Sequence, residues 1–205
     1  MFQINGYCDY SAASGFYWLR KPPPFGLTQV WCDFETREEM YAVVVDETAL
    51  RDLGNNPKKL PALAKEFRLT FQLNMQDMGP VFQLISQDGN MLVGLVVRKD
   101  DAYYKTKQHA LHVMITKTTP GQMTGRDSEP ANLQVGTKWN DLTIAKRQVG
   151  GAYGVDVYVN SEKVMDFKPF EDCPVFNNVT VTTGHGDVKI PNPAHLRNFY
   201  LYNKF

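Results

Sequence analysis

The sequence lacks an excess of charge of either sign, and it lacks long hydrophobic runs. Lysine plus arginine and aspartate plus glutamate each number 22 among the 205 residues, so the formal net charge is zero. Without a basic patch, neither nucleic acid nor an anionic membrane surface is expected as the main partner. No stretch approaches the roughly 20 apolar residues of a membrane-spanning helix, and we expect no transmembrane segment.

The short motifs that mark common catalytic sites are also missing. The sequence contains no Gly-x-Ser-x-Gly, no phosphate-binding loop and no dinucleotide fingerprint. His109 and His112 are three residues apart, so on a strand they would face opposite sides and make a poor metal pair. We therefore predict a protein that is not an enzyme and has no resident cofactor.

Cysteine is scarce, and its odd number leaves two interpretations open. Cys8, Cys32 and Cys173 cannot all pair within one chain. In the cytosol all three would be thiols, whereas outside the cell two would pair and one would be left over. Cys173 follows Glu171-Asp172, and acidic neighbours disfavour the reactive thiolate. Cys173 is therefore interpreted as a free or interchain thiol and not as a nucleophile.

What the sequence does contain is a succession of short strand patterns. Residues 67–73 alternate apolar and polar side chains with the period of a half-buried strand. Residues 81–86 and 91–98 flank the turn at 87–90, whose Asp-Gly pair is a strong hairpin signal. Further strand patterns occur at 110–117, 139–146, 155–159, 164–167, 178–183 and 196–202. Many short strands separated by turn residues predict an all-β protein built as an antiparallel β-sandwich.

The N-terminal part of the chain has a different composition. Residues 1–46 hold aromatic-rich strand patterns at 15–19, 29–34 and 40–46, with a proline run after the first. Residues 47–66 contain a helical pattern at 47–53 and a short turn at 60–63, so we interpret them as a connector that packs on the sandwich. Residues 118–137 are rich in turn-forming and charged residues and predict a long surface loop.

Residues 8–36 contain three conspicuous features: Cys8, the run Ser14-Gly15-Phe16-Tyr17-Trp18-Leu19 and the run Val30-Trp31-Cys32-Asp33-Phe34-Glu35-Thr36. Together they resemble the opening of fibrinogen-type C-terminal domains, and collagen C-propeptides carry a similar run. The resemblance implies a disulfide between Cys8 and Cys32, worth about 3 kcal/mol in the chain-entropy model, and an extracellular or cell-surface location. Because no Gly-Gly-Trp follows Thr36, it implies no calcium or ligand pocket of that family. No signal peptide is visible in MFQINGYCDY.

Residues 67–205 resemble the laminin-G-like and thrombospondin-N-terminal-like sandwiches of the concanavalin-A superfamily, which are jelly rolls. The ordered segments that carry this resemblance are 67–71, 79–84, 138–144, 155–164 and 196–199. The resemblance implies an extracellular adhesion, matrix or filament-assembly module that contacts other proteins or itself. The alternative is a lectin-like glycan-binding domain, with or without calcium. Thrombospondin-N-like domains often have a cysteine where this chain has Ser161, so their disulfide is not implied.

Two polar motifs remain as candidate sites. Asp88 and Asn90 stand at the turn where laminin-G-like domains supply a calcium ligand, although Asn90 is an amide where calcium favours carboxylates. Asp187 is a candidate second ligand. Asn178-Val179-Thr180 is an N-glycosylation acceptor pattern, which is usable if the chain is secreted and Asn178 faces water.

Overall fold

Strands make up most of the chain in the computed structural model. It describes residues 15–20, 27–32, 38–99, 109–116, 122–127, 133, 136, 138–170, 174–183 and 193–204. The strands are β1 (Gly15–Arg20), β2 (Leu27–Cys32), β3 (Glu38–Val44), β4 (Thr48–Ala49), β5 (Lys58–Leu63), β6 (Glu66–Met75), β7 (Gly79–Ile85), β8 (Met91–Lys99), β9 (His109–Thr116), β10 (Met123–Asp127), β11 (Asn140–Val149), β12 (Ala152–Val159), β13 (Glu162–Phe170), β14 (Phe176–Thr182) and β15 (Ala194–Lys204). The short helix α1 (Leu50–Asn55) follows β4.

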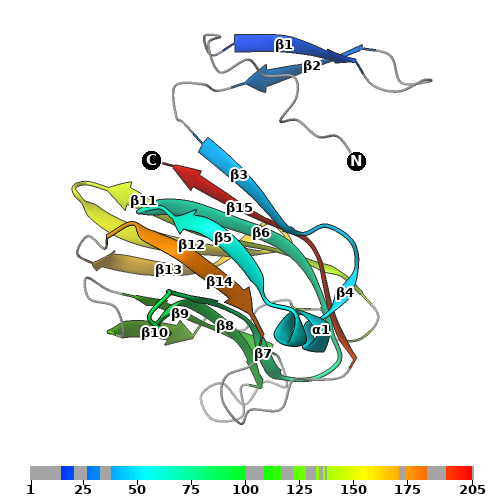
Figure 1. Ribbon diagram of the computed structural model, residues 1–205, viewed down its shortest axis with the longest axis vertical. Helices are drawn as coiled ribbons and strands as arrows, with labels where there is room; N and C mark the ends of the chain where they lie inside the picture. Colours follow the sequence, from blue (N-terminus) through cyan, green and yellow to red (C-terminus); the bar gives the residue numbers. More distant parts are fainter. Residues whose placement is uncertain are drawn as a thin grey trace.

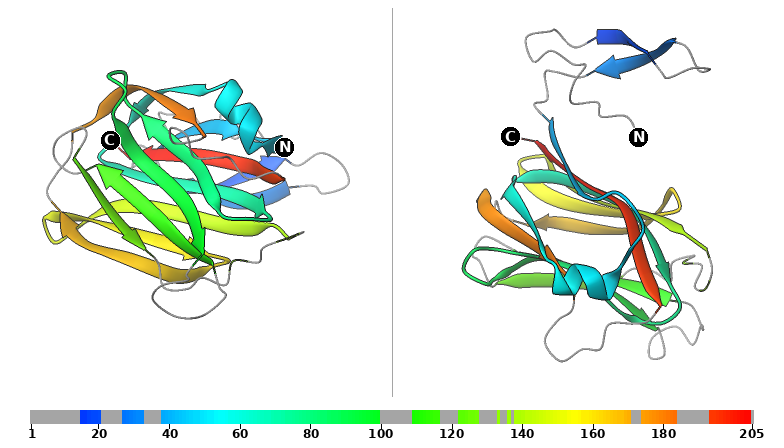
Figure 2. Two further views of the ribbon diagram at one scale, coloured as in Figure 1. Left: turned by 90° about the horizontal axis from the view of Figure 1, so that it is seen from below. Right: turned by 45° about the vertical axis from the view of Figure 1, so that its right-hand side comes forward.

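Two antiparallel sheets face each other and form the sandwich (Figures 1 and 2). The seven-stranded sheet has the order β13-β12-β11-β6-β15-β3, with β4 also pairing with β15. The six-stranded sheet has the order β10-β9-β8-β7-β14-β5. β1 and β2 form a separate two-stranded hairpin, in which Gly15 lies opposite Cys32. The expected all-β sandwich is therefore confirmed, and the strand patterns expected at 15–19 and 29–34 correspond to β1 and β2.

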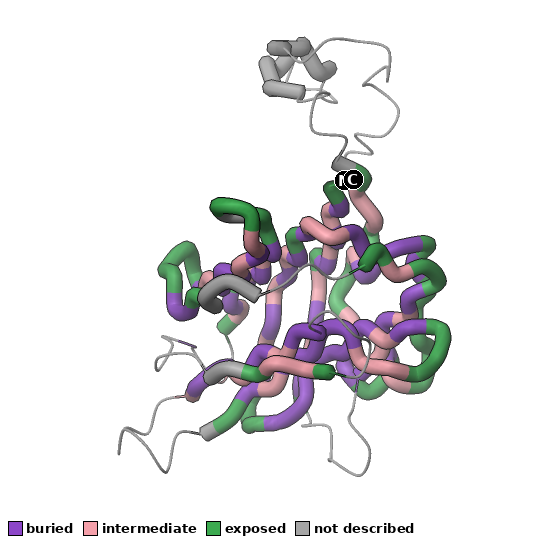
Figure 3. Tube along the Cα trace, turned by 90° about the vertical axis from the view of Figure 1, so that its left-hand side faces the viewer, coloured by how far each residue is buried: buried purple, intermediate pink, exposed green. Residues whose placement is uncertain are grey.

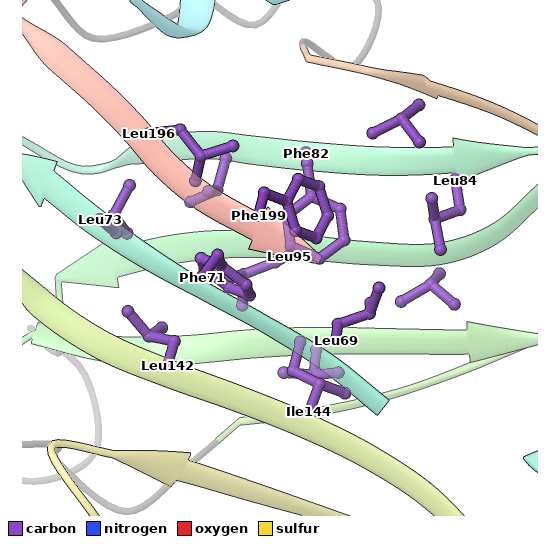
Figure 4. Close-up of a cluster of buried hydrophobic side chains, with 14 of the residues drawn as sticks. Leu69, Phe71, Leu73, Phe82, Leu84, Leu95, Leu142, Ile144, Leu196 and Phe199 are labelled. Atoms are coloured by element: carbon purple, nitrogen blue, oxygen red, sulfur yellow. The ribbon is translucent and has the colours of Figure 1, made fainter. Parts of the chain in front are cut away.

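Alternation of apolar and polar side chains decides which side of a strand such as β6 is buried, as the colours along the strands in Figure 3 show, whereas residues 79–84 of β7 are all buried. β6 buries every second residue: Phe67, Leu69, Phe71, Leu73 and Met75. Phe71 lies 5.3 Å from both Phe82 of β7 and Phe199 of β15, measured between ring centroids, and Phe82 lies 5.1 Å from Phe199. These rings join the two sheets at the centre of the core (Figure 4), in the edge-on and tilted arrangements that aromatic pairs favour.

Two stretches differ from the expectation. The predicted turn at 60–63 is wrong, because these residues belong to β5, an edge strand of the six-stranded sheet. Proline is tolerated on an edge strand, where the N–H that it lacks is not needed by a neighbour, so Pro61 does not end the strand. The predicted loop at 118–137 contains the short edge strand β10, which pairs with β9.

The first two parts of the predicted division, 1–46 and 47–66, both contribute strands to the sandwich. β3 pairs with β15 in the seven-stranded sheet, and β5 pairs with β14 in the six-stranded sheet. The short turn or helix expected at 47–53 is confirmed in part: α1 begins at Leu50, with Leu50 and Leu53 buried, whereas Thr48 and Ala49 form β4. The described part of the chain holds no helix with the length and hydropathy that crossing a membrane requires.

Polar side chains tie the two sheets together at the side where β5 and β15 meet. Asn203 of β15 is fully buried. Its Nδ2 donates to the carbonyl of Ala62 at 2.9 Å, and its Oδ1 accepts from the N–H of Ala64 at 3.0 Å. Near α1, the hydroxyl of Thr183 donates to the buried carbonyl of Leu50 at 2.6 Å. Both side chains thus hydrogen-bond to backbone groups that are buried away from water.

Replacing Asn203 with alanine should destabilise the sandwich. The Asn203→Ala variant leaves the carbonyl of Ala62 and the N–H of Ala64 without these partners, so we expect the free energy of unfolding to fall by about 1–3 kcal/mol. Urea denaturation monitored by tryptophan fluorescence measures the change. Asn177→Ala, at an exposed position of β14, is the matched control and should change stability by less than about 0.5 kcal/mol. Equal losses in the two variants would contradict the assigned role of Asn203.

Candidate functional site

The outer face of the seven-stranded sheet gathers polar and aromatic side chains. The inward residues of β6 are apolar, so Arg68, Thr70 and Gln72 point outward. Thr70 lies opposite Thr143 of β11 on one side and Tyr200 of β15 on the other. Thus β11, β6 and β15, which are far apart in sequence, present one continuous surface.

A bulge in β15 positions the residues beside Gln72. Arg197 lies opposite Gln72 and Tyr200 lies opposite Thr70, so the register shifts by one residue between them. Asn198 occupies the bulge with φ at 51°, a left-handed conformation that asparagine tolerates better than most residues. The extra residue places Arg197 and the Asn198 amide next to the same glutamine.

A chain of contacts connects side chains from β11, β6 and β15. Gln72 Nε2 donates to Asp141 Oδ1 at 2.7 Å, and Gln72 Oε1 accepts from Arg197 Nε at 2.7 Å and from Asn198 Nδ2 at 3.2 Å. The guanidinium carbon of Arg197 lies 4.0 Å from the centroid of the Trp139 ring. We call these five residues the Trp139–Arg197 cluster.

The turn between β12 and β13 fixes the start of β11, where Asp141 belongs to the cluster. Asn160 and Ser161 both have positive φ, at 49° and 69°, as a tight hairpin turn requires. Asn160 Oδ1 accepts from the N–H of Asp141 at 3.0 Å, and Asn160 Nδ2 donates to Asn140 Oδ1 at 3.2 Å. Asn140 points inward and is fully buried. Consequently Asp141 points outward at a fixed position.

The cluster combines donors, an acceptor and an aromatic surface. A guanidinium carries five N–H donors, and a carboxylate accepts at about four lone-pair positions. The contacts with Gln72 use one donor of Arg197 and one oxygen of Asp141. Farther along β15, His195 Nδ1 lies 3.4 Å from Glu47 Oε1, which adds a second polar pair to the same face.

A separate charged group lies on the same face at β12. Arg147 Nη2 lies 2.7 Å from Asp156 Oδ2, and Lys163 Nζ lies 2.6 Å from Asp156 Oδ1. Burial of Asp156 raises its pKa, but the hydrogen bonds from Lys163 and Arg147 and their positive charges outweigh burial, so the pKa is lowered from the ordinary 3.8. The hydrogen bond to Asp156 raises the pKa of Lys163. This group cross-links β11, β12 and β13.

The cysteine predictions fall mainly outside the described residues. Cys8 and Cys173 both lie there, and of Cys32 the structure describes only the backbone, at the end of β2. The Cys8–Cys32 disulfide and the free or interchain state of Cys173 therefore stay predictions.

Asp88 and Asn90 lie in the turn between β7 and β8, as expected. The turn is closed by backbone bonds from Gly89 N to Ser86 O at 3.0 Å and from Ser86 N to Asn90 O at 2.8 Å. Asp88 is exposed, and Asp187 lies outside the described ranges. In the described ranges no three His, Cys, Asp or Glu side chains form a group suited to a metal, and the calcium site stays a prediction.

Asn178 is exposed on β14, and its Nδ2 donates to Gln87 Oε1 at 3.2 Å. Val179 and Val181 are buried, so Asn178 and Thr180 point to the outer face of the six-stranded sheet. The glycosylation motif therefore meets the condition of facing water, while its use stays a prediction.

None of the five residues of the Trp139–Arg197 cluster was identified from the sequence. Alternation does mark Gln72, Asp141 and Arg197 as outward positions of their strands. It does not reveal that β11, β6 and β15 are neighbours, and this pairing is what brings the residues together.

Several solved structures resemble this chain at low sequence identity. A tetrameric galectin from the ball sponge Cinachyrella sp. is 14% identical to this chain. The match covers 73% of this chain and 99% of the galectin chain, with a TM-score of 0.44. A heptameric SAP-like pentraxin from Limulus polyphemus is 13% identical over 69% of this chain and 65% of its own, with a TM-score of 0.46. Domain 4 of the extracellular arabinanase AbnA from Geobacillus stearothermophilus, solved with arabinotriose, is 12% identical over 94% of this chain and 77% of its own, with a TM-score of 0.44.

No protein-family model and no curated protein matches the sequence. At these low identities and TM-scores the likeness to solved structures indicates neither a superfamily nor a ligand, and the β-sandwich rests on the two sheets themselves. The likeness does not single out laminin-G-like domains, so the laminin-G-like and thrombospondin-N-like resemblance stays a prediction.

The charged group around Asp156 predicts a pH dependence of stability. Because the pKa of Asp156 is lowered in the folded state, its ionised form stabilises the fold at pH values above 3.8, and this contribution is lost as the pH falls through the lowered value. We expect Asp156→Asn to reduce the free energy of unfolding at pH 7 by about 2 kcal/mol. The difference from the unmodified protein should shrink below about pH 4.

Urea denaturation at pH 7, 5 and 3 measures this dependence. Asp46→Asn is the matched control, because it removes the same charge from an exposed side chain and should change stability little at any pH. A stability loss in Asp156→Asn that is the same at pH 7 and pH 3 would contradict the ionic role.

Proposed function

We propose that this protein is a non-enzymatic binding module that recognises a saccharide through the Trp139–Arg197 cluster on the outer face of the seven-stranded sheet. An extracellular or cell-surface location, expected from the fibrinogen-like N-terminal run, belongs to the same proposal. The contact chain from Asp141 through Gln72 to Arg197, with Trp139 stacked on the guanidinium, carries the proposal.

The chemistry of the cluster matches the chemistry of a sugar ring. Each hydroxyl of a sugar both donates and accepts hydrogen bonds, so neighbouring hydroxyls fit a site that offers a guanidinium donor beside a carboxylate acceptor. The C–H face of the ring is apolar, and half-buried Trp139 supplies an aromatic surface for it. The acidic and basic members balance each other, which favours a neutral saccharide over a strongly anionic one.

Gln72 prepares the site for binding. Its amide nitrogen donates to Asp141 and its amide oxygen accepts from Arg197, so the positions of both charged side chains are fixed before a ligand binds. Side chains that are already ordered lose less conformational entropy on binding. All the supporting strands belong to a hydrogen-bonded sheet, which suits precise positioning better than a loop does.

A glycan array with the full-length protein, followed by calorimetric titration of the best neutral hit, tests the saccharide proposal. Trp139→Ala should abolish measurable binding, and Arg197→Met should weaken it about tenfold or more, because a hydrogen bond to a charged group contributes about 1.5–3 kcal/mol. Arg51→Met, which replaces an exposed arginine of α1, is the matched control and should bind normally.

Two outcomes would count against the saccharide proposal. Binding that is equal in Arg197→Met and Arg51→Met would place the ligand elsewhere. Ligand recovered as shorter fragments after prolonged incubation would contradict a non-enzymatic role.

We propose adhesion or assembly through protein contacts as the second candidate function. It is favoured by the pair of Arg68 and Tyr202 on the same outer face, whose guanidinium carbon and ring centroid lie 4.4 Å apart, since arginine and tyrosine are enriched in protein interfaces. The edge strands favour it less. β5 carries Lys58, Lys59 and Pro61, which are typical protection against edge-to-edge pairing.

Sedimentation velocity over a range of concentrations, with reductant present to exclude a Cys173-linked dimer, tests self-association. We expect a concentration-dependent dimer that Arg68→Ala weakens and that Arg51→Ala leaves unchanged. A monomer at every concentration would contradict assembly with itself, and it would leave the saccharide proposal intact.

A further inference from the structure

The outer face of the six-stranded sheet carries a group of sulfur and imidazole side chains. Three of the eight methionines of the chain, Met91, Met114 and Met123, lie on adjacent strands β8, β9 and β10. All three are half-buried, as is His112 on β9. Two glycines flank Met114 in the sheet, because Gly94 of β8 and Gly125 of β10 lie directly opposite it.

The glycine of β8 leaves the space that two methionines fill. A Cβ atom on Gly94 would lie 2.8 Å from Met91 Sδ and 2.9 Å from Met114 Cε. Real side chains do not approach so closely, so both methionines fold over the bare backbone of Gly94. The sulfur of Met91 and the terminal methyl group of Met114 therefore lie beside each other.

Gly125 of β10 likewise leaves space for side chains on the other side of Met114. A Cβ atom on Gly125 would lie 2.9 Å from His112 Nε2 and 3.4 Å from Met114 Cγ. The sulfur of Met114 is bonded to both Cγ and Cε, so it lies between the two glycines. It is consequently flanked by the Met91 thioether toward β8 and by the His112 imidazole toward β10.

Met123 brings a third thioether to the Met91 end of this group. Thr116, which lies opposite Met123, donates from its hydroxyl to the carbonyl of Met91 at 2.6 Å, and the same oxygen lies 3.0 Å from Met123 Sδ. The buried threonine thus places the Met123 thioether near the main chain of Met91. We call Met91, Met114, Met123 and His112 the methionine group.

From this juxtaposition we propose that the methionine group binds one Cu(I) ion. Thioether sulfur is a soft ligand that selects Cu(I), and imidazole also suits copper. Met91, Met114 and His112 are the expected ligands.

The competing explanation is that the methionines only fill space. Methionine adapts to irregular gaps, and leucine of similar volume would fill them as well. The two explanations differ in whether replacing sulfur with carbon, at constant volume, changes any property besides stability.

Silver ion titration tests the proposal, because Ag(I) is a soft ion like Cu(I) and does not change oxidation state. The full-length protein is first treated with an alkylating agent under denaturing conditions with reductant and refolded, so that no thiol competes. With 13C-labelled methionine methyl groups, we expect the signals of Met91 and Met114 to shift and to saturate at one Ag(I) per chain. The signal of Met75, buried in the core, should not shift.

Two variants decide between binding and packing. Met114→Leu should lose saturable Ag(I) binding and should no longer retain Cu(I) against a chromophoric Cu(I) chelator. Met78→Leu is the matched control, because Met78 is 49% exposed between β6 and β7, and it should bind both ions normally. Where Met114→Leu unfolds, His112→Gln with the same methyl spectra replaces it and should also lose binding.

Absence of Ag(I) binding by the alkylated, refolded protein, with a native methyl spectrum, would overturn the proposal. So would equal binding by Met114→Leu and Met78→Leu. Neither outcome bears on the saccharide proposal, which concerns the opposite sheet.

Discussion

The contact between the inner faces of the two sheets is the interaction on which the rest of the structure depends. Phe71 and Phe199 from the seven-stranded sheet meet Phe82 from the six-stranded sheet at ring-centroid separations of 5.1 to 5.3 Å. Burying such side chains contributes most of the stability that a sandwich has. Because strand residues alternate in direction, fixing one side of a strand to this core leaves its other side facing away from the core. Both candidate sites consist of these outward residues.

The same alternation explains which strands can be predicted from the sequence. In β6, strict alternation from Phe67 to Leu73 predicts both the strand and its buried side, and the structure confirms them. Pro61 predicted a turn and was misleading, because an edge strand tolerates a residue that a central strand does not. β10 was missed since Met123-Thr-Gly-Arg-Asp has no apolar alternation, and it is a strand because β9 offers it an edge. Local pattern predicts strands, whereas edge position is a property of the whole sheet.

The sites were harder to predict for a related reason. Gln72, Asp141 and Arg197 are far apart in sequence, and only the order β11-β6-β15 makes them neighbours. The register adds a further condition. Without the extra residue at Asn198, the residues of β15 before the bulge would change faces relative to those after it, because a shift by one residue reverses the side. The positive φ of Asn198 is therefore a condition for Arg197 and Tyr200 to share the outer face.

The side chains on the two outer faces are positioned in different ways, by hydrogen bonds on one sheet and by the space beside glycines on the other. On the seven-stranded sheet, hydrogen bonds hold charged groups at fixed positions, with Gln72 between Asp141 and Arg197. On the six-stranded sheet, the missing side chains of Gly94 and Gly125 create the space, and flexible thioethers fill it. The first arrangement suits a ligand recognised by directional hydrogen bonds. The second suits a soft, polarisable partner, because thioethers contribute polarisability and weak hydrogen bonding. One fold can thus present two surfaces of different chemistry, since the core constrains only the inward half of each strand.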